Sequence, residues 1–139
     1  MSVEENKITI HRIFEEIYGE GNLSIIPEVI SPNYFFRDPP REFKGIDGYK
    51  SMVTSFLAAF PDTRYTVEDI VGEKNWTATR CILNCTFKGE IMGLAPTGKP
   101  IQIKVAYFNR FKDGKVVETI RFIDWLDFFR QAGITPPMD

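Results

Sequence analysis

Residues 101–123 read IQIKVAYFNRFKDGKVVETIRFI, and they contain the strongest turn signal of the chain. Apolar and polar side chains alternate on both sides of Asp113-Gly114, a dipeptide that is typical of a tight β-hairpin when alternating segments flank it. The stretch therefore predicts two long antiparallel strands, residues 101–112 and 115–123, joined by a two-residue turn.

This turn also predicts which side chains share a face of the sheet, because it sets Phe111 opposite Val116 and the pairing continues in steps of two residues. The predicted apolar face consists of Ile103, Val105, Tyr107, Asn109, Phe111, Val116, Glu118, Ile120, Phe122 and Asp124. The other face is more polar and includes Gln102, Lys104, Arg110, Thr119 and Arg121. We expect helices to cover the first face, and water or a second subunit to cover the other. One β-bulge would reverse the assignment.

Helices are expected in the first half of the chain. Ser2 begins a capping-box sequence, and apolar residues then recur at helical intervals until Gly19. Ser24 can cap a short second helix. A third helix is expected from a cap at Asp47 to a stop at Pro61, with its aromatic and aliphatic residues on one side.

Strands are expected in the second half. Beside the hairpin, residues 65–70 alternate with a period of two, and residues 76–87 are rich in Thr, Cys and aliphatic side chains. A short helix at residues 125–132 is closed by Gly133. The order of elements predicts an α+β fold in which N-terminal helices pack on a strongly curved antiparallel sheet, as one domain spanning residues 1–139.

Composition excludes several classes of protein. Hydrophobic residues make up 43% of the 139 residues and the net charge is −2, which indicates a folded protein and disfavours nucleic acid as a partner. No apolar run approaches the length of a membrane helix and no leader is evident, so a cytoplasmic location is expected. One His and two Cys, Cys81 and Cys85, are too few ligands for a Cys/His zinc site, so no metal is expected and both thiols are interpreted as buried small hydrophobes.

Asp124 is the first candidate for chemistry. The predicted pairing puts it at the far end of the apolar face, where loss of water can raise the pKa of a carboxyl group and make it a useful base. It also precedes the helix at residues 125–132, so it is equally well placed to be the N-cap of that helix. The two roles are compatible.

Arg37 and Asp38 follow an aromatic run and precede two prolines. One interpretation is a turn in which Asp38 bonds to its own backbone. The other makes Arg37 a cation that anchors an anionic group of a ligand or pairs with Asp124.

Several aromatic and aliphatic side chains are either core residues or walls of a cavity between the helices and the sheet. With Asp38, the candidates for ligand contacts are Phe14, Tyr18, Phe35, Met52, Phe56, Met92, Tyr107, Ile120 and Phe122. The loop at residues 88–99 either covers the mouth of that cavity or is a long hairpin connection.

Taken together, these segments resemble the SnoaL-like polyketide cyclase family. The similar stretches are the two N-terminal helices, Asp-Pro-Pro at 38–40, Ala-Ala-Phe-Pro-Asp at 58–62, Val-Glu-Asp-Ile at 67–70, the loop at 89–99, and Arg110 with the hairpin at 113–118. The match runs from about residue 4 to residue 133. The resemblance implies the nuclear transport factor 2-like fold, a cone of helices on a bent antiparallel sheet, often dimeric through the sheet.

For cyclases of this family, the resemblance implies an intramolecular aldol closure of a polyketide ester with no metal, cofactor or covalent intermediate. It implies an acid/base aspartate at the end of the last strand, matched here by Asp124. The family often has His at the positions of Arg37 and Phe87.

We therefore expect a pocket for a small, largely apolar carbonyl compound and cofactor-free cyclisation, isomerisation or hydration. Asp124 would be the acid/base, Arg37 its electrostatic partner or the ligand's anchor, and Tyr107 a possible hydrogen-bond donor. The alternative is a non-catalytic module that binds a hydrophobic ligand or assembles as a homodimer.

Overall fold

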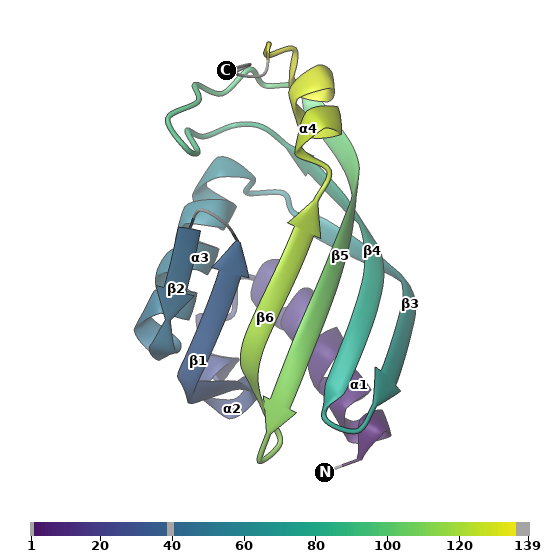
Figure 1. The fold of residues 1–139 in the computed structure, drawn as a ribbon. Helices are drawn as coiled ribbons and strands as arrows, with labels where there is room; N and C mark the ends of the chain where they lie inside the picture. Colours follow the sequence, from purple (N-terminus) through teal and green to yellow (C-terminus); the bar gives the residue numbers. More distant parts are fainter. Residues whose placement is uncertain (1, 39–40, 136–139) are drawn as a thin grey trace.

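The computed structural model of the chain describes residues 2–38 and 41–135, with Asp38 described by its backbone alone. The N-terminal helices form one layer, a six-stranded sheet forms the other, and the C-terminal helix lies at one end of the sheet (Figure 1). The helical segments are α1 (Val3–Arg12), η1 (Ile13–Tyr18), η2 (Leu23–Ile25), α2 (Ile26–Val29), α3 (Gly45–Ala59) and α4 (Trp125–Ala132). The strands are β1 (Ile30–Asp38), β2 (Arg41–Lys44), β3 (Arg64–Glu73), β4 (Trp76–Thr86), β5 (Pro100–Lys112) and β6 (Lys115–Ile123).

The start of α1 confirms the predicted capping box. The Ser2 hydroxyl accepts a hydrogen bond from the backbone N–H of Glu5, at 3.1 Å, and the Glu5 carboxylate accepts one from the backbone N–H of Ser2. After Arg12 the helix widens into the π-helical turn η1, which ends at Gly19. A π-helical segment is rare and was not predicted.

Two predicted caps are wrong. Asn22, not Ser24, caps the short turn η2, because its side-chain oxygen accepts from the backbone N–H of Ser24. Helix α3 begins at Gly45, two residues before Asp47, so Asp47 lies in the first turn instead of at the cap. Gly45 has a φ of +71°, which a glycine adopts without steric cost.

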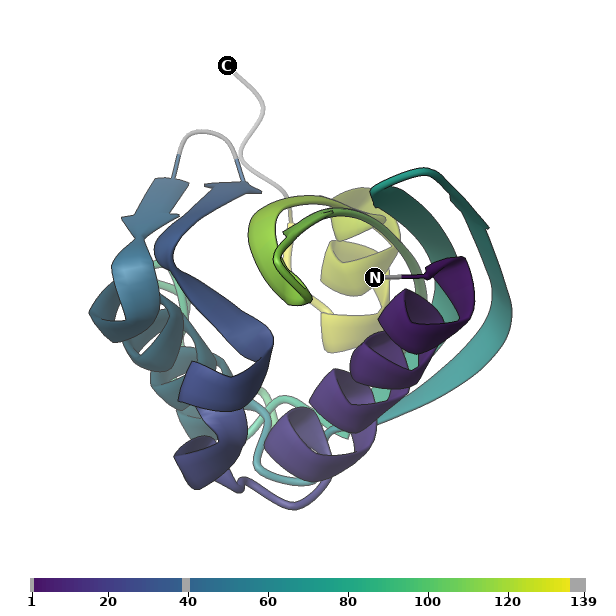
Figure 2. The same cartoon turned by 90° about the horizontal axis from the view of Figure 1, so that it is seen from below.

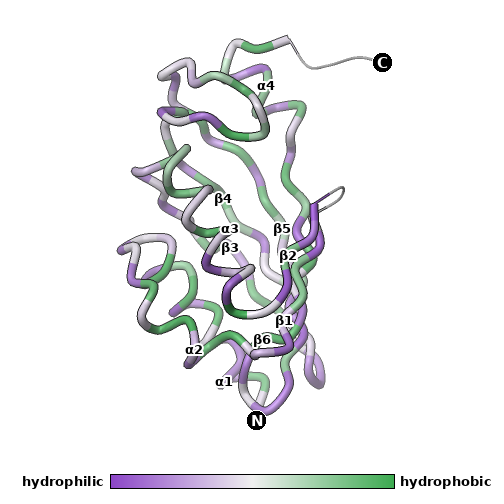
Figure 3. The backbone as a smooth tube through the Cα atoms, turned by 90° about the vertical axis from the view of Figure 1, so that its left-hand side faces the viewer, coloured by the Kyte–Doolittle hydropathy of each residue, from purple (hydrophilic) through white to green (hydrophobic). Residues whose placement is uncertain are grey.

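The sheet has the order β2-β1-β6-β5-β4-β3. Most pairs are antiparallel, but β1 runs parallel to β6. Seen from below, the sheet curls around the helices. Helix α1 lies toward one end of the curved sheet, and α2 and α3 lie toward the other (Figure 2). Figure 3 shows the two layers edge-on, with α1 to α3 on one side and β1, β2, β5 and β6 on the other.

The hairpin forms as predicted, but its pairing changes after two residues. Asp113 and Gly114 both have positive φ, and Phe111 pairs with Val116. The next pair is Arg110 with Glu118, so Val117 is an extra residue in β6 with no partner opposite, a β-bulge. Every residue of β6 after Val117 therefore lies on the opposite face from the one predicted.

The bulge exchanges polar and apolar side chains between the two faces. Thr119 and Arg121, assigned to the polar face, lie on the inner face and are 4% and 3% exposed. Ile120 and Phe122 lie on the outer face, where Phe122 is 61% exposed. The outer face is thus less polar than predicted, and the inner face contains a buried cation.

The core fills the space between the layers, and it includes both cysteines as buried free thiols, as predicted. Burial raises the pKa of Cys81 and of Cys85 to about 12, which makes both thiols poor nucleophiles. Among the described residues, no helix is both long and apolar enough to cross a membrane.

Candidate functional site

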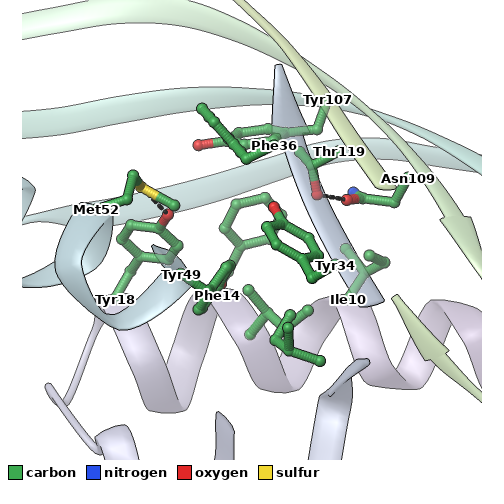
Figure 4. A pocket seen from close by; sticks show the side chains of 12 residues that line it. Ile10, Phe14, Tyr18, Tyr34, Phe36, Tyr49, Met52, Tyr107, Asn109 and Thr119 are labelled. Atoms are coloured by element: carbon green, nitrogen blue, oxygen red, sulfur yellow. Dashed lines mark hydrogen bonds between the residues drawn. The ribbon is translucent and has the colours of Figure 1, made fainter. Parts of the chain in front are cut away.

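A small cavity lies inside the cone, between α1, η1 and α3 on one side and the inner face of β1, β5 and β6 on the other (Figure 4). Four of the predicted ligand contacts line it: Phe14, Tyr18, Met52 and Tyr107. Its volume is about 20 Å³, enough for one water molecule.

The cavity also has walls that were not predicted. They are three isoleucines of α1, η1 and β1, three aromatic residues and two polar residues of the hairpin: Ile10, Ile13, Ile30, Tyr34, Phe36, Tyr49, Asn109 and Thr119. Tyr34 and Phe36 face inward because alternate residues of β1 do so. Asn109 was predicted on this face, whereas Thr119 reaches it only through the bulge in β6.

Polar groups gather at the sheet side of this cavity. Asn109 and Thr119 are paired across β5 and β6, and the Thr119 hydroxyl donates to the Asn109 side-chain oxygen at 2.6 Å. The nearby Tyr34 is 2% exposed, and its hydroxyl has no hydrogen-bond partner among the described residues. A buried hydroxyl in that state is costly, so this end of the cavity is suited to a polar atom of a ligand or to a water.

A pair of tyrosines occupies the neighbouring part of the interior. The hydroxyl groups of Tyr65 on β3 and Tyr107 on β5 are 2.8 Å apart. Burial is the main cause that raises the pKa of both phenols above its ordinary value, although the charge of Arg121 acts in the opposite direction. Burial also raises the pKa of Tyr34 and of Tyr49. These four hydroxyls are therefore protonated at neutral pH and are hydrogen-bond donors, not bases.

Arg121 is the buried cation of the site. It pairs with Tyr107 across β5 and β6, and its guanidinium carbon lies 4.9 Å from the ring centre of Phe36 and 5.8 Å from that of Phe56. Both distances fit a cation–π contact. Sequence reasoning missed this residue because it placed Arg121 on the outer face.

A second cavity, also of about 20 Å³, shares Met52 with the first among its described lining residues. It is lined from β2, α3, β6, the loop after β4 and the start of α4 by Arg41, Phe43, Met52, Ser55, Phe56, Ile91, Arg121 and Trp125. Phe56 was a predicted contact. The loop at residues 88–99 contributes Ile91, which is 7% exposed, whereas the predicted contact Met92 is 46% exposed and lines neither cavity.

Asp124 does not lie inside the cone. It is exposed and caps α4, where its carboxylate accepts a hydrogen bond from the backbone N–H of Asp127 at 3.0 Å. It lines an open surface hollow together with Leu126 and Arg130. The expected capping role is confirmed and the expected dry, inward position is wrong, since the bulge at Val117 reverses the face. The catalytic role of Asp124 stays a prediction.

The expected pairing of Arg37 with Asp124 is also wrong. The Arg37 side chain is 57% exposed on the outer face, where its Nε lies 3.3 Å from a carboxylate oxygen of Glu118 and its guanidinium stacks on the ring of Phe35. The predicted contacts Phe35, Ile120 and Phe122 lie on the same outer face and line neither cavity. The Asp38 side chain and the predicted turn at 39–40 lie outside the described residues.

One signal in the sequence could have found the inner polar groups. Strand β6 does not alternate strictly: Val116-Val117 and Phe122-Ile123 are neighbouring apolar residues, and Glu118-Thr119 are neighbouring polar residues. Val116 and Val117 are both buried, at 0% and 7% exposure. Two neighbouring apolar residues in an alternating strand are compatible with a bulge between them, but a buried strand end gives the same pattern.

No group of three or more His, Cys, Asp or Glu side chains able to hold a metal ion occurs among the residues that the structure describes. The described residues that line the two cavities include no carboxylate and no histidine. The described residues that line the two cavities offer aromatic surface, neutral hydroxyl donors, the amide of Asn109 and the guanidinium groups of Arg41 and Arg121.

Known proteins share both the sequence pattern and the fold. The family model of the SnoaL-like polyketide cyclases matches residues 8–132. Aklanonic acid methyl ester cyclase DauD from Streptomyces sp. (strain C5) is 25% identical over 134 residues, which cover 91% of this chain and 81% of DauD.

Two solved structures extend the likeness. AclR from Streptomyces galilaeus, a proposed hydroxylase, superposes with a TM-score of 0.82 at 28% identity, covering 99% of this chain and 91% of AclR. IdmH from Streptomyces antibioticus, a proposed polyketide cyclase, gives a TM-score of 0.78 at 29% identity, covering 93% of this chain and 99% of IdmH.

Proposed function

Since the chain belongs to the SnoaL-like polyketide cyclase family, we propose that it binds a small, largely apolar carbonyl compound inside the cone and catalyses a cofactor-free reaction at the carbon next to the carbonyl. The reaction class is cyclisation, isomerisation or hydration. The observation that carries the proposal is the set of buried donors formed by Tyr65, Tyr107 and Arg121.

These groups suit a reaction in which negative charge develops on a carbonyl oxygen. Removal of a proton from the neighbouring carbon converts the carbonyl compound into an enolate, whose charge resides mainly on oxygen. Neutral hydroxyls and a buried cation stabilise such an oxyanion more in a water-poor interior than they do in water. The raised pKa of Tyr107 keeps its hydroxyl protonated and able to donate.

The absence of a carboxylate among the described lining residues limits the substrate. No described lining residue is a general base of ordinary strength, so we propose a carbon-bound proton acidic enough for a water or a basic group of the substrate to accept it. A carbon between two carbonyl groups meets this condition. We therefore propose a 1,3-dicarbonyl compound as the substrate class.

The test is deuterium exchange at the carbon between the carbonyls of ethyl benzoylacetate, followed by NMR in D₂O. We expect the wild-type protein to accelerate the exchange over buffer, and Tyr107→Phe to slow the accelerated reaction by about 100-fold, the size of effect that loss of one oxyanion donor causes. The matched control is Phe108→Leu, because that side chain is next to Tyr107 on β5 but points to the outer face.

A non-catalytic binding module is the second candidate, and binding in either role requires the lining side chains to move. Each holds about 20 Å³, far below the roughly 300 to 1,000 Å³ of a pocket for a drug-sized ligand. If the protein binds ethyl benzoylacetate by calorimetry but leaves its exchange rate at the buffer value, the binding module is the correct assignment.

We also propose that the protein is a homodimer through the outer face of the sheet. Four exposed apolar residues gather there, and we call them the convex patch: Val71, Trp76, Phe108 and Phe122. Phe108 and Phe122 are in edge-to-face contact, with ring centres 6.2 Å apart. A cluster of exposed aromatic residues on one face is typical of an interface.

The dimer predicts that Phe122→Asp weakens self-association by about 10-fold or more, because it places a charge in a desolvated contact. Sedimentation equilibrium measures this change. The control is Leu126→Asp, because Leu126 is 69% exposed on α4, outside the convex patch. A wild-type protein that stays monomeric at high micromolar concentration would exclude the dimer.

A further inference from the structure

Helix α1 buries few apolar side chains against the sheet. Its buried residues are Asn6 and Ile10, one polar and one apolar, whereas η1, which follows it directly, buries two isoleucines, a phenylalanine and a tyrosine. Burial of apolar surface is the main force that holds an amphipathic helix in place. Helix α1 is therefore attached weakly to the rest of the fold, and η1 is attached firmly.

The contact of α1 with the sheet also buries polar atoms. Helix α1 packs against β3 and β4, and the inner face of β4 presents Thr77 and Thr79, which are 1% and 2% exposed. Among the described residues, neither of these hydroxyls has a hydrogen-bond partner, and the side-chain oxygen of Asn6 has none either. Each such atom destabilises the closed contact, because water satisfies it once the helix moves away.

The first turn of α1 touches β3 at a close point. A Cβ atom added at Gly72 would lie 2.6 Å from Cγ1 of Val3 and 3.6 Å from Cγ2 of Thr77. Gly72 and Thr77 are paired across β3 and β4. Val3 approaches the sheet here because residue 72 has no side chain, and Thr77 lies in the same contact.

The junction between α1 and η1 has the hydrogen bonding of a bend. The backbone N–H of Ile13 is shared between the carbonyl oxygens of Thr9 and Ile10, and the π-helical turn begins at Ile13. Helices bend at π-helical turns. Arg12 ties the junction to η1, since its Nε lies 2.8 Å from a carboxylate oxygen of Glu16. A motion of α1 would therefore pivot at this junction.

Ile10 connects α1 to the first cavity, which it lines on the helix side (Figure 4). The cavity holds about 20 Å³, and all the described residues that line it are buried. A guest molecule larger than a water therefore enters only when a part of this wall moves. Of the elements that form the wall, α1 is the one with the weakest apolar attachment, because Ile10 is its single buried apolar residue.

We propose that α1 is the gate of the interior: it swings away from β3 and β4 about its junction with η1, while η1 and the sheet stay in place, and so removes Ile10 from the cavity wall. In the open state the side chains of Asn6, Thr77 and Thr79 gain water as a partner, which offsets the lost burial of Ile10. Entry of a guest through this gate rests on the function proposed above, whereas the motion itself does not.

Native-state hydrogen exchange followed by NMR measures the motion. We expect the backbone amides of residues 7–12 to exchange through one shared opening, about 100-fold or more faster than those of β5. Thr77→Val combined with Thr79→Val replaces both hydroxyls by methyl groups of the same shape and should slow exchange in α1 by about 10-fold. The matched control is Thr66→Val, because Thr66 is exposed on β3. Faster exchange of α1 in the double valine variant would show that the hydroxyls are satisfied in the closed protein, and it overturns the gate.

A reversible crosslink tests the gate within one protein. Val3→Cys combined with Gly72→Cys places a sulfur near the position of Cγ1 of Val3, next to the new Cβ atom, so that a disulfide can form. Cys81 and Cys85 are buried, with a pKa raised to about 12, and do not compete for oxidation. In the oxidised variant, exchange of the α1 amides should slow by about 10-fold or more relative to those of β5. Calorimetric binding of ethyl benzoylacetate should be lost, and reduction should restore both. The control is Val3→Cys alone under the same two conditions.

The outcomes separate the gate from the proposed function. If the oxidised variant binds ethyl benzoylacetate as the reduced one does, the guest enters elsewhere and the role of α1 in entry is overturned. If the amides of α1 exchange only together with those of β5, α1 does not open by itself and the gate is overturned whatever the ligand does. If the wild-type protein neither binds ethyl benzoylacetate nor accelerates its deuterium exchange, the proposed function fails, while hydrogen exchange still decides whether α1 opens.

Discussion

Arg121 shows how one residue sets the character of the interior. A guanidinium at 3% exposure has lost nearly all its water, and such a charge is tolerated only where other groups replace that water. The rings of Phe36 and Phe56 and the phenol of Tyr107 supply part of the replacement. The same groups make the interior around Arg121 cationic and poor in water, which is the basis of the proposed reaction.

A prediction about a single residue concerns Asp124. Because its carboxylate caps α4 and is exposed, we expect Asp124→Ala to lower the free energy of unfolding by about 1 kcal/mol and Asp124→Asn to lower it by less. Urea denaturation measures both. Deuterium exchange of ethyl benzoylacetate should be unchanged in the Asn variant, and loss of exchange in a stably folded Asp124→Asn protein would instead support the acid/base role expected from the sequence.

The π-helical turn η1 directly follows α1 and carries residues that line the cavity. Its last hydrogen bond runs from the backbone N–H of Gly19 to the carbonyl oxygen of Phe14, five residues earlier, at 3.0 Å. Phe14 and Tyr18, four residues apart, both line the cavity. Such turns recur at functional sites in helices, and here the turn sets the position of the hydroxyl that holds Met52.

Gly19 is essential to this geometry. A Cβ atom at position 19 would lie 2.5 Å from the carbonyl oxygen of Glu15, which is backbone and cannot give way cheaply. We therefore expect Gly19→Ala to lower the free energy of unfolding by about 1 to 3 kcal/mol. Thermal and urea denaturation test this, with Glu15→Ala as a control in the same turn, since Glu15 is exposed and should change stability by less than about 0.5 kcal/mol. A Gly19→Ala protein as stable as the control would show that the turn can relax.

The molecule as a whole concentrates its tyrosines in the interior. All five are in or against the core, and burial raises the pKa of Tyr34, Tyr49, Tyr65 and Tyr107. The unfolded chain ionises its phenols near pH 10, whereas the folded chain holds these protons to higher pH. The folded state then binds more protons than the unfolded state, so stability must fall as the pH rises above about 10.

The resulting prediction is a cooperative alkaline transition. When pH is raised, ultraviolet absorbance of tyrosinate should stay low until the protein unfolds and then rise in one step that coincides with the loss of far-ultraviolet circular dichroism. Tyr107→Phe removes one of the raised groups and should reduce the amplitude of the step. Tyrosinate absorbance that rises gradually near pH 10 while the circular dichroism stays native would contradict the burial of these phenols.

Local sequence was enough for the parts of the fold that depend on neighbours along the chain. The Asp113-Gly114 turn, the capping box at Ser2, the cap of α4 and the α+β order of helices and strands are all observed, because dihedral preference and hydrophobic period act within a few residues. The predicted pocket contacts on η1 and α3 followed from the same helical period.

Local sequence could not predict on which face of the sheet the side chains of β6 lie. Whether Val117 is paired or bulged depends on how Val116 and Val117 pack together against the core, and a shift of one residue sends every later side chain to the other face. Tertiary packing therefore decided that Arg121 lies inside and Asp124 outside. It also decided the size of the cavities, because the space left between packed side chains is set by their rotamers across distant elements and not by the spacing of residues along the chain.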